Sequence, residues 1–392
     1  MRTLLITGPG GSGRTTMAAA TALRAAREGA RTLLLTCDDA LPAGLVPGDV
    51  PGLAVRRTDP AEGFRDVLDA LQGQAGAAFD LLGARPLERD EITPLPGARE
   101  LAVLAALREA ARSGAHDLLV ADLPAAPEAL ALLALPGELR RYLRRLLPQE
   151  RQAARALRPL LGRLAGVPMP SERLYESAAR WEEQLAEVED LLGRAEVRLT
   201  AEPGPSALEA VRAAVLGLAL HGLRPGALLA TRVVPDASSD TWLTTLAAQQ
   251  RKALDEWAAA GLPVHPVPHL GREPRGADDL TALGVPGADA TATSPGARAA
   301  GSWAVERPVE DRTAEDGSLV WRIPLPGAVR EELELVRRGD ELLLAAGRFR
   351  RALALPPALR RCAVTGAALR EGVLAVRFVP DPAVWPRPSA ER

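Results

Sequence analysis

The sequence is short of two residue types that matter for chemistry. Its 48 basic residues include a single lysine, Lys252, and it contains no asparagine. Chemistry that usually depends on a lysine ammonium or an asparagine amide must therefore be carried out by other groups or be absent. Cys37 and Cys362 are far apart in the chain and outside any CxxC or Cys/His cluster, so the sequence supports neither a disulfide framework nor a zinc site. We expect both thiols to be buried as small apolar groups.

Long apolar runs and a strong charge of one sign are also lacking. The longest candidate membrane span, residues 118–135, is interrupted by Asp122, Glu128 and prolines, and the N-terminal apolar run is too short for a signal peptide. With 50 acidic and 48 basic residues the net charge is −2, which gives no general electrostatic reason to bind nucleic acid. We therefore expect a cytoplasmic protein that neither spans a membrane nor binds nucleic acid.

The pattern along residues 1–285 predicts an α/β fold. Short apolar runs, beginning with residues 3–7 and 32–36, alternate with longer helical stretches rich in Ala, Leu, Arg and Glu. Such alternation is typical of βαβ units, so we expect a parallel sheet flanked by helices. From about residue 139 to 193 the pattern is almost purely helical, which predicts a helical insertion into this domain.

A second, smaller module is predicted near the C-terminus. Residues 286–318 are rich in Gly, Pro, Ala, Ser, Thr and Asp with little periodicity, which indicates a linker. Residues 319–380 contain closely spaced short apolar runs around turn pairs such as Gly339-Asp340, which predicts a small all-β sandwich. The proline-rich tail, 381–392, is expected to fray.

A glycine-rich loop near the N-terminus is the most specific motif. Residues 8–16, GPGGSGRTT, follow a predicted strand and precede a helical pattern, which is the context and G-x-x-x-x-G-[K]-[ST] frame of a phosphate-binding loop. In such a loop the glycines let backbone N–H groups surround phosphate oxygens, and the helix N-terminus adds a partial positive charge. The candidate nucleotide-binding residues are Gly8, Gly10, Gly11, Ser12, Gly13, Arg14, Thr15 and Thr16. Thr15 is also the candidate Mg²⁺ ligand, and the alternative to all of this is a tight turn with a structural role.

Arg14 occupies the lysine position of this frame. A lysine ammonium is a compact charge that reaches the β- and γ-phosphates, whereas a guanidinium is a wide planar fork. Arg14 keeps the positive charge and could hold a phosphate through two hydrogen bonds, so it is also a candidate catalytic residue. Whether it fits the same narrow cradle is left open by the sequence.

Together with this loop, the segments LLLTCDDA (33–40) and DLPAAPEALALLALP (122–136) resemble the arsenite-pump-driving (ArsA) and tail-anchored-protein-targeting ATPases. The resemblance spans nearly the whole chain and implies binding of ATP or ADP with Mg²⁺. The family loop reads G-K-G-G-V-G-K-T-T, so two lysines are replaced here. Pro9 stands for the lysine that in the family reaches the partner subunit's nucleotide, and Arg14 stands for the ordinary phosphate-binding lysine.

The resemblance also assigns roles to residues that follow other strands. Asp38 matches the aspartate that orients the attacking water, which makes it a candidate catalytic residue; an Asp that caps a turn is the alternative. Asp122 matches the acid that holds Mg²⁺, whereas Ala126 replaces a threonine that contacts the γ-phosphate. Thr231 replaces the family's adenine-contacting asparagine, and Thr231 and Arg232 are candidate nucleotide-binding residues.

Two further regions resemble partner-binding parts of the family. The helical insertion corresponds to a methionine-rich groove for a transmembrane helix in the targeting ATPases, but only Met169 of three methionines lies in it here. Its apolar stripe, from Leu174 to Leu192, is either core packing or a client site, and its basic run, 140–145, is either a solvated face or a partner site. The C-terminal module resembles an alpha-crystallin-like domain, and it either pairs with another chain through its strand edges or is a passive domain.

Two functional interpretations remain open at this point. The first is ATP binding with weak or absent hydrolysis, coupled to a hydrophobic protein client or a membrane-protein partner. The second is a hydrolysis-dead scaffold or adaptor that binds protein partners without nucleotide cycling. Since Pro9 has neither a charge nor a backbone N–H, we expect any homodimer to form independently of ATP. Cys37 and Cys362 cannot form the three-thiol arsenite site of the pump ATPases, so arsenite binding is not supported.

Overall fold

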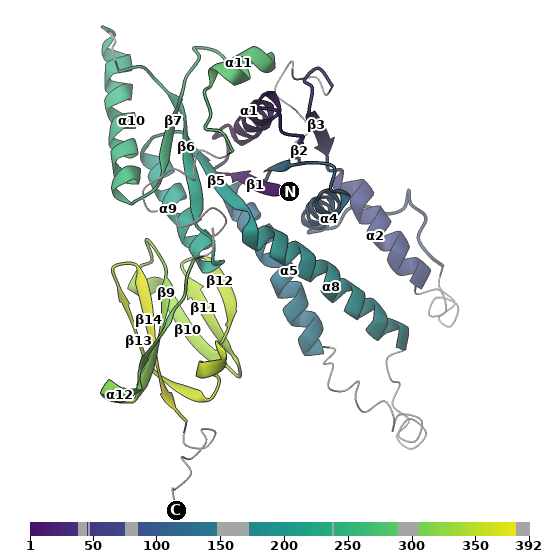
Figure 1. Ribbon diagram of the computed structural model, residues 1–392, viewed down its shortest axis with the longest axis vertical. Coiled ribbons are helices and arrows are strands. Elements are labelled where there is room, and N and C mark those ends of the chain that lie inside the picture. Colours follow the sequence, from purple (N-terminus) through teal and green to yellow (C-terminus); the bar gives the residue numbers. More distant parts are fainter. Residues whose placement is uncertain are drawn as a thin grey trace, which may run out of the picture. The chain divides into compact units, whose positions relative to one another are not determined.

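Strands and helices alternate along the first part of the chain, as the sequence predicts. The computed structural model describes residues 1–37, 45, 48–74, 85–146, 172–236, 239–288 and 305–381 (Figure 1). In these ranges, no helix combines the length and the apolar character needed to span a membrane. Asp38 and most of the predicted tail lie outside the described residues.

A seven-stranded parallel sheet has the order β3-β2-β4-β1-β5-β6-β7. In it β4 lies between β1 and β2, with Leu4 of β1 opposite Val120. Leu4, Leu5 and Ile6 are fully buried, as expected of a parallel strand that is covered on both faces. The strands are β1 Arg2–Thr7, β2 Thr32–Thr36, β3 Leu53–Arg57, β4 Leu118–Asp122, β5 Glu196–Ala201, β6 Pro225–Val233 and β7 Val264–Pro268.

Helices follow most of these strands. The alanine-rich α1 (Arg14–Arg27) packs its small side chains against β1, β2 and β4, which allows a close approach to the sheet. Asp240 caps α10 by accepting a 3.0 Å hydrogen bond from the N–H of Leu243. The other helices of the first 288 residues are α2 Pro60–Gln74, α4 Ala98–Ser113, α5 Ala126–Leu146, α8 Glu172–Arg194, α9 Pro205–Leu220, α10 Thr241–Ala259 and α11 Gly276–Ala282.

The helical region predicted at 139–193 begins earlier in the structure. Helix α5 starts at Ala126, directly after β4, and continues through Pro136, which a sequence reading takes as a helix boundary. Pro136 is itself buried, so its packing offsets the backbone hydrogen bond that a proline removes from a helix. Helix α8 packs against α5, and Met169 lies outside the described residues.

Helices α5 and α8 are joined by an apolar contact and by ion pairs. Among the stripe residues of α8 whose side chains the structure describes, Leu185, Val188 and Leu192 are buried. Arg140 pairs with Glu189, and Arg144 pairs with Glu182. Part of the predicted basic run therefore faces the carboxylates of the neighbouring helix, and the stripe packs as core at the C-terminal end of α8.

The C-terminal strands form two antiparallel sheets of their own, β10-β11-β12 and β13-β14-β9-β8. Strand β8 lies within the predicted linker, 286–318, and pairs with β9, so the module begins before residue 319. Its sequence, VEDR, lacks the apolar alternation that marks a strand. The elements are β8 Val309–Arg312, α12 Thr313–Asp316, β9 Ser318–Pro324, η3 Arg330–Glu332, β10 Leu333–Arg338, β11 Glu341–Ala346, β12 Phe349–Ala354, η4 Pro357–Leu359, β13 Cys362–Arg370 and β14 Val373–Pro380. The predicted fold class, a parallel α/β sheet followed by an antiparallel β-module, is confirmed.

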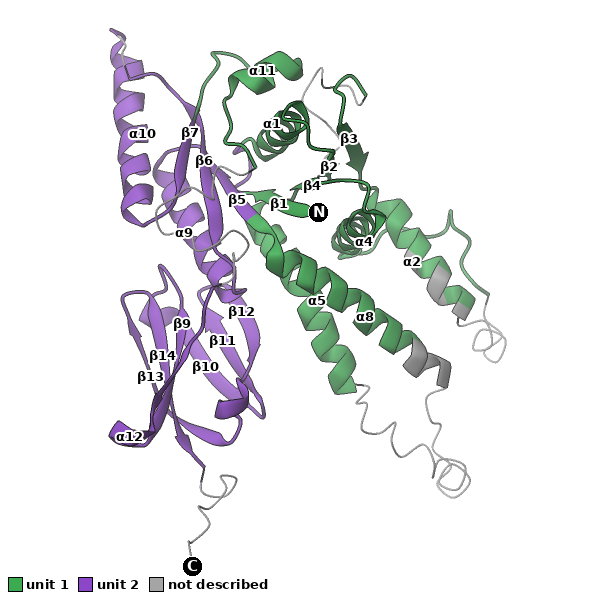
Figure 2. Ribbon diagram, in the orientation of Figure 1, with its two compact units in different colours: residues 1–7, 13–196, 267–293 green, residues 8–12, 197–266, 294–392 purple. Residues whose placement is uncertain are grey.

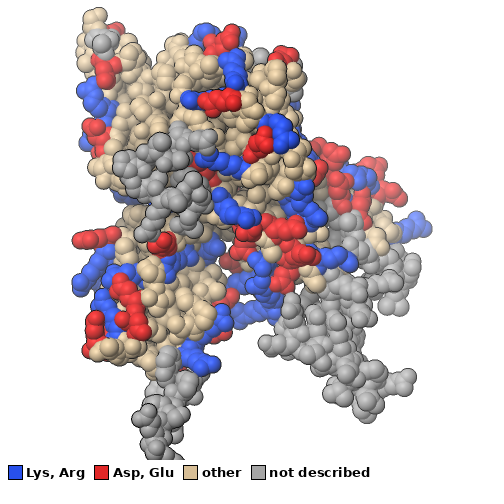
Figure 3. Space-filling model, in the orientation of Figure 1, with Lys and Arg blue, Asp and Glu red and all other residues tan. Residues whose placement is uncertain are grey.

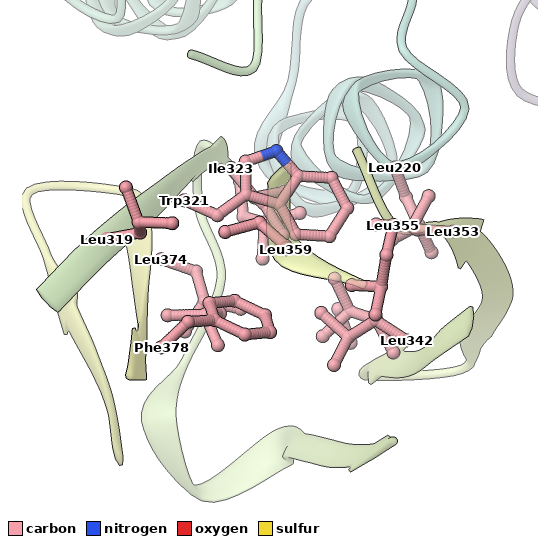
Figure 4. Packing of buried hydrophobic residues seen from close by; sticks show 14 of the residues in the cluster. Leu220, Leu319, Trp321, Ile323, Leu342, Leu353, Leu355, Leu359, Leu374 and Phe378 are labelled. Atoms are coloured by element: carbon pink, nitrogen blue, oxygen red, sulfur yellow. The ribbon is translucent and has the colours of Figure 1, made fainter. Parts of the chain in front are cut away.

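The two sheets of the β-module enclose one apolar core (Figure 4). Trp321 and Phe378 from one sheet share this core with Leu342 and Leu353 from the other. Leu220 at the end of α9 is part of the same cluster and is fully buried. The module thus shares its core with a helix of the α/β region.

The chain divides into two compact units (Figure 2). The first comprises residues 1–7, 13–196 and 267–293, and the second comprises residues 8–12, 197–266 and 294–392. The division falls inside the glycine loop: Gly8–Ser12 belongs to the second unit, and the loop from Gly13 onward belongs to the first. On the face shown in Figure 3, basic and acidic side chains are interspersed.

Candidate functional site

The first half of the glycine loop, Gly8–Ser12, is fastened to the end of β5. The N–H and the hydroxyl of Ser12 both donate to the carbonyl of Pro9, at 3.3 and 2.7 Å, which closes a tight turn. The same hydroxyl shares a 2.6 Å hydrogen bond with Thr200 Oγ1. A Cβ atom on Gly8 would lie 2.1 Å from the carbonyl oxygen of Thr200, so glycine is required there. The Ser12 side chain, predicted to bind nucleotide, braces the loop from inside.

Two residues of β6 hold the same part of the loop. The Thr231 hydroxyl donates to the Ser12 carbonyl at 3.0 Å, and Arg232 Nη1 donates to the Gly11 carbonyl at 3.1 Å and to Glu202 at 2.8 Å. Arg232 has a φ of 55°, a left-handed conformation that residues with a side chain rarely adopt and that is frequent at functional sites. The predicted residues Thr231 and Arg232 therefore fix the peptide planes of the loop.

The second half of the loop is the start of α1. Gly13, with a φ of 79°, precedes the helix, and no side chain caps its first turn. Arg14, Thr15 and Thr16 make up that turn, which contains no acidic residue. The first N–H groups of a helix have no acceptor within the helix and carry a partial positive charge, so this turn is suited to an anion.

A cavity of about 220 Å³ lies beside this turn in the first unit. Arg14 Nη1 donates a 2.6 Å hydrogen bond to the carbonyl of Leu123, the residue after β4, and Arg99 Nη2 donates at 2.9 Å to the carbonyl of Cys37, the residue after β2. The cavity is lined by Arg14, Cys37, Arg99, Asp122, Leu123, Pro124, Ala125 and Glu128. Two guanidinium groups and two carboxylates therefore meet at the carboxyl ends of neighbouring strands, where open α/β sheets bind ligands.

Asp122 is the buried acid of this cavity. It is 2% exposed, and its Oδ2 accepts a 2.9 Å hydrogen bond from the hydroxyl of Thr36 at the end of β2. Carboxylate and hydroxyl oxygens are the ligands that Mg²⁺ prefers. In the ranges that the structure describes, no group of three or more His, Cys, Asp or Glu residues could enclose a metal ion. The oxygens present suit an ion that keeps several waters and binds partly through phosphate, as Mg²⁺ commonly does.

The loop also leaves room for a phosphate chain. Nothing lies within 4 Å of the positions that Cβ atoms would take on Gly10 and Gly11. Within the first unit, the cation Arg14, the buried acid Asp122 and the uncapped start of α1 fit a phosphate chain with Mg²⁺ in chemistry.

Sequence reasoning located Arg14 and Asp122, which line one cavity, but it missed Arg99 and Glu128 in the same cavity. Arg99 belongs to no recognisable motif, because it reaches the cavity from α4, which lies far along the chain from the loop. The contact of Thr200 with the loop was not predicted either. Thr200 lies near the carboxyl end of β5, and in parallel sheets that end of the strands is where ligand sites form, so its position was a usable signal. Both cysteines are buried, as expected, and Cys37 lines the cavity.

A parallel sheet with a glycine loop between its first strand and first helix, and a buried acid at the end of a neighbouring strand, defines the P-loop class of nucleotide-binding proteins.

Comparison with known proteins specifies the family. Residues 1–285 match the anion-transporting ATPase (ArsA) family, and residues 316–378 match an HSP20-like domain found in ArsA. The chain is 63% identical over 399 residues to an uncharacterized protein of Streptomyces coelicolor, which covers 99% of this chain and 100% of that protein. It is 31% identical over 427 residues to a protein of Mycobacterium tuberculosis, with 98% and 97% covered. It is 26% identical over 398 residues to an Aquifex aeolicus protein named as a candidate arsenical pump-driving ATPase, with 92% and 95% covered.

The chain therefore belongs to the ArsA family of P-loop ATPases and carries a C-terminal HSP20-like domain.

Proposed function

We propose that this chain binds Mg-ATP and Mg-ADP at Gly8–Thr16, that it hydrolyses ATP weakly or not at all, and that its nucleotide state is coupled to a hydrophobic protein client or a membrane-protein partner. The observation that carries this proposal is Arg14, which lines a cavity with the buried acid Asp122. A cation and a buried carboxylate beside a helix N-terminus support binding of a phosphate chain with Mg²⁺. A bound Mg-ATP would supply the phosphoanhydride and the metal charge.

The protein's own groups then have separate tasks. Arg14 and the first amides of α1 would hold phosphate oxygens, and Asp122 and the Thr15 hydroxyl would hold Mg²⁺. Thr231 and Arg232 keep the loop carbonyls turned toward β6, and they affect the nucleotide by fixing the loop. Asp38, as the water-positioning residue, remains part of the proposal.

Slow hydrolysis follows from two replacements. The Arg14 guanidinium is tied to the carbonyl of Leu123 at 2.6 Å, so part of its hydrogen-bonding capacity is spent inside the protein. Ala126, the first residue of α5, offers no hydroxyl to a terminal phosphate. Losing a single charge-stabilising group commonly lowers a rate by about 10²–10³-fold.

Direct binding and turnover measurements test this proposal. Isothermal titration with Mg-ATP and Mg-ADP should show binding, and a phosphate-release assay on the same protein should show little or no turnover. Arg14→Ala should weaken binding, and Arg14→Lys should raise turnover if the guanidinium is what limits it. Arg112→Ala, which removes an exposed arginine of α4, is the matched control. Brisk wild-type turnover that Arg14→Lys leaves unchanged would contradict the proposal of weak hydrolysis.

The self-association proposed for this chain is independent of ATP. Pro9 contributes no charge and no N–H, and its carbonyl already accepts two hydrogen bonds from Ser12. A ligand shifts an equilibrium only through contacts that differ between the two states. Sedimentation with and without a non-hydrolysable ATP analogue should give the same oligomeric state, and dimerisation seen only with the analogue would refute this.

A scaffold that binds protein partners without nucleotide cycling is the second candidate. It is favoured by the replacement of both family lysines, by Pro9 and Arg14, and by Ala126 and Thr231 at the positions of the family's threonine and asparagine. A folded wild-type chain that binds neither Mg-ATP nor Mg-ADP in the titration would support this candidate over the first.

A further inference from the structure

Arg99 shares three features with Arg14. Each lies in the first turn of its helix, Arg14 in α1 and Arg99 in α4. Each helix is preceded by a glycine in the left-handed region, Gly13 or Gly97, and neither glycine provides a side-chain cap. Each guanidinium lines the same cavity of about 220 Å³.

Both arginines have more hydrogen-bond donors than the described residues use. A guanidinium has five N–H donors, and among the residues that the structure describes each of these two gives one hydrogen bond to a main-chain carbonyl, of Leu123 or of Cys37. Neither forms an ion pair with any residue in the part of the chain that the structure describes. Many other arginines do, including Arg31 with Asp117 and Arg140 with Glu189.

A positive charge in the first turn of a helix is unfavourable by itself. The helix N-terminus carries a partial positive charge, which repels a cation and attracts an anion. Glu100 in the first turn of α4 offsets part of this cost, whereas the first turn of α1 has no acid. An anion bound between the two guanidinium groups would offset the repulsion between each arginine and the N-terminus of its own helix.

We infer that Arg99 is a second phosphate-binding residue and that it forms, with Arg14, a two-arginine clamp for the phosphoanhydride group of a nucleotide within a single copy of the chain. The two anchoring carbonyls follow β2 and β4, which are adjacent in the sheet, so the arginines approach the cavity from neighbouring strand ends. Asp122 and Glu128 in the same cavity keep its net charge low and leave a carboxylate for Mg²⁺. This inference rests on the proposed function, because it names the residues that hold the phosphates.

Substitution of Arg99 in the full chain tests the clamp. Arg99→Gln removes the charge and should weaken binding of Mg-ATP, measured by titration calorimetry, by about 10- to 100-fold, as for loss of a charge-assisted hydrogen bond. Arg99→Lys keeps the charge but loses the fork, and should lie between the wild type and Arg99→Gln. Arg112→Gln is the control, since Arg112 is on the same helix about 20 Å away, with a side chain 64% exposed. Thermal unfolding of each variant verifies that the fold is kept.

Inorganic pyrophosphate as a second probe separates failure of the clamp from failure of the proposed function. If the wild type binds pyrophosphate but no nucleotide, the proposed function fails, and a loss of pyrophosphate binding in Arg99→Gln still supports the clamp. If Arg99→Gln binds Mg-ATP and pyrophosphate as the wild type does, the clamp is wrong while the proposed function stands. A wild type that binds neither probe overturns both.

Discussion

Leu220→Ala should destabilise the β-module, although Leu220 belongs to a helix of the α/β region. Leu220 is fully buried and lies in one cluster with Trp321, Leu353 and Phe378 of the module (Figure 4). The substitution removes about three carbon groups, which at about 0.8 kcal/mol each gives about 2.4 kcal/mol of lost transfer free energy. The cavity left behind raises the expected cost to about 3–5 kcal/mol.

Urea unfolding followed by the fluorescence of Trp321, in a chain whose five other tryptophans are replaced by phenylalanine, measures this cost, because Trp321 is 3% exposed within the same core. Leu146→Ala is the matched control, since Leu146 is 77% exposed on α5 and its loss should change the free energy of unfolding by less than about 0.5 kcal/mol. A double-mutant cycle with Leu353→Ala on β12, the strand that α9 contacts, should show a coupling of at least about 0.5 kcal/mol. A loss below about 1 kcal/mol in Leu220→Ala, or additive effects in the cycle, would show that helix and module do not share a core.

Two further predictions concern the loop and a buried histidine. Gly8→Ala should unfold the loop or prevent soluble expression, because its Cβ would lie 2.1 Å from the Thr200 carbonyl, whereas Gly10→Ala has open space and should leave the melting temperature unchanged. Equal melting temperatures of the two variants would contradict this account. Burial, with the charges of Arg351 and Arg307, lowers the pKa of His221 to about 3, below its usual 6.5. Since the unfolded chain takes up this proton and the folded one does not, stability should be full above pH 6.5 and should fall toward pH 3, by at most about 1.4 kcal/mol per pH unit. His221→Gln should reduce that slope in urea unfolding measured between pH 7 and 4, and an unchanged slope would rule out His221 as its source.

The sequence predicts the fold well where the signal is local. The apolar run of β1 and the glycine loop after it identify the class because both lie in one short segment, and the C-terminal strands stand out by their spacing. The predicted boundaries of helices and modules are wrong where tertiary packing determines how far an element extends. Helix α5 continues through Pro136, which is buried, and β8 forms from a polar tetrapeptide because its partner β9 supplies the pairing.

The candidate site is less predictable, because most of its contacts join residues far apart in the chain. The motif frame points to Arg14, but it contains no sign of Leu123 as the hydrogen-bond acceptor of the guanidinium. Ser12 looks like a ligand-binding residue in the motif, yet its hydroxyl turns inward to Pro9 and Thr200. Arg99 can be recognised as a site residue only from the fold, which places the start of α4 near the ends of β2 and β4.

Because the chain has a single lysine, its cationic contacts, such as those of Arg14 and Arg99, are made by guanidinium groups. A lysine ammonium is a flexible point charge, whereas a guanidinium donates along fixed directions in a plane, so it can bind two acceptors at once. Arg307 Nη2 donates to the carbonyls of Ala219 and Leu220 at the end of α9, where a cation also complements the helix dipole. Arg14 donates to one carbonyl, that of Leu123, and under the proposed function its other donors hold phosphate. Arg14→Lys is therefore not a conservative change: it would release the carbonyl of Leu123 as well as alter the contact with phosphate, and both effects should appear together in the binding and turnover of that variant.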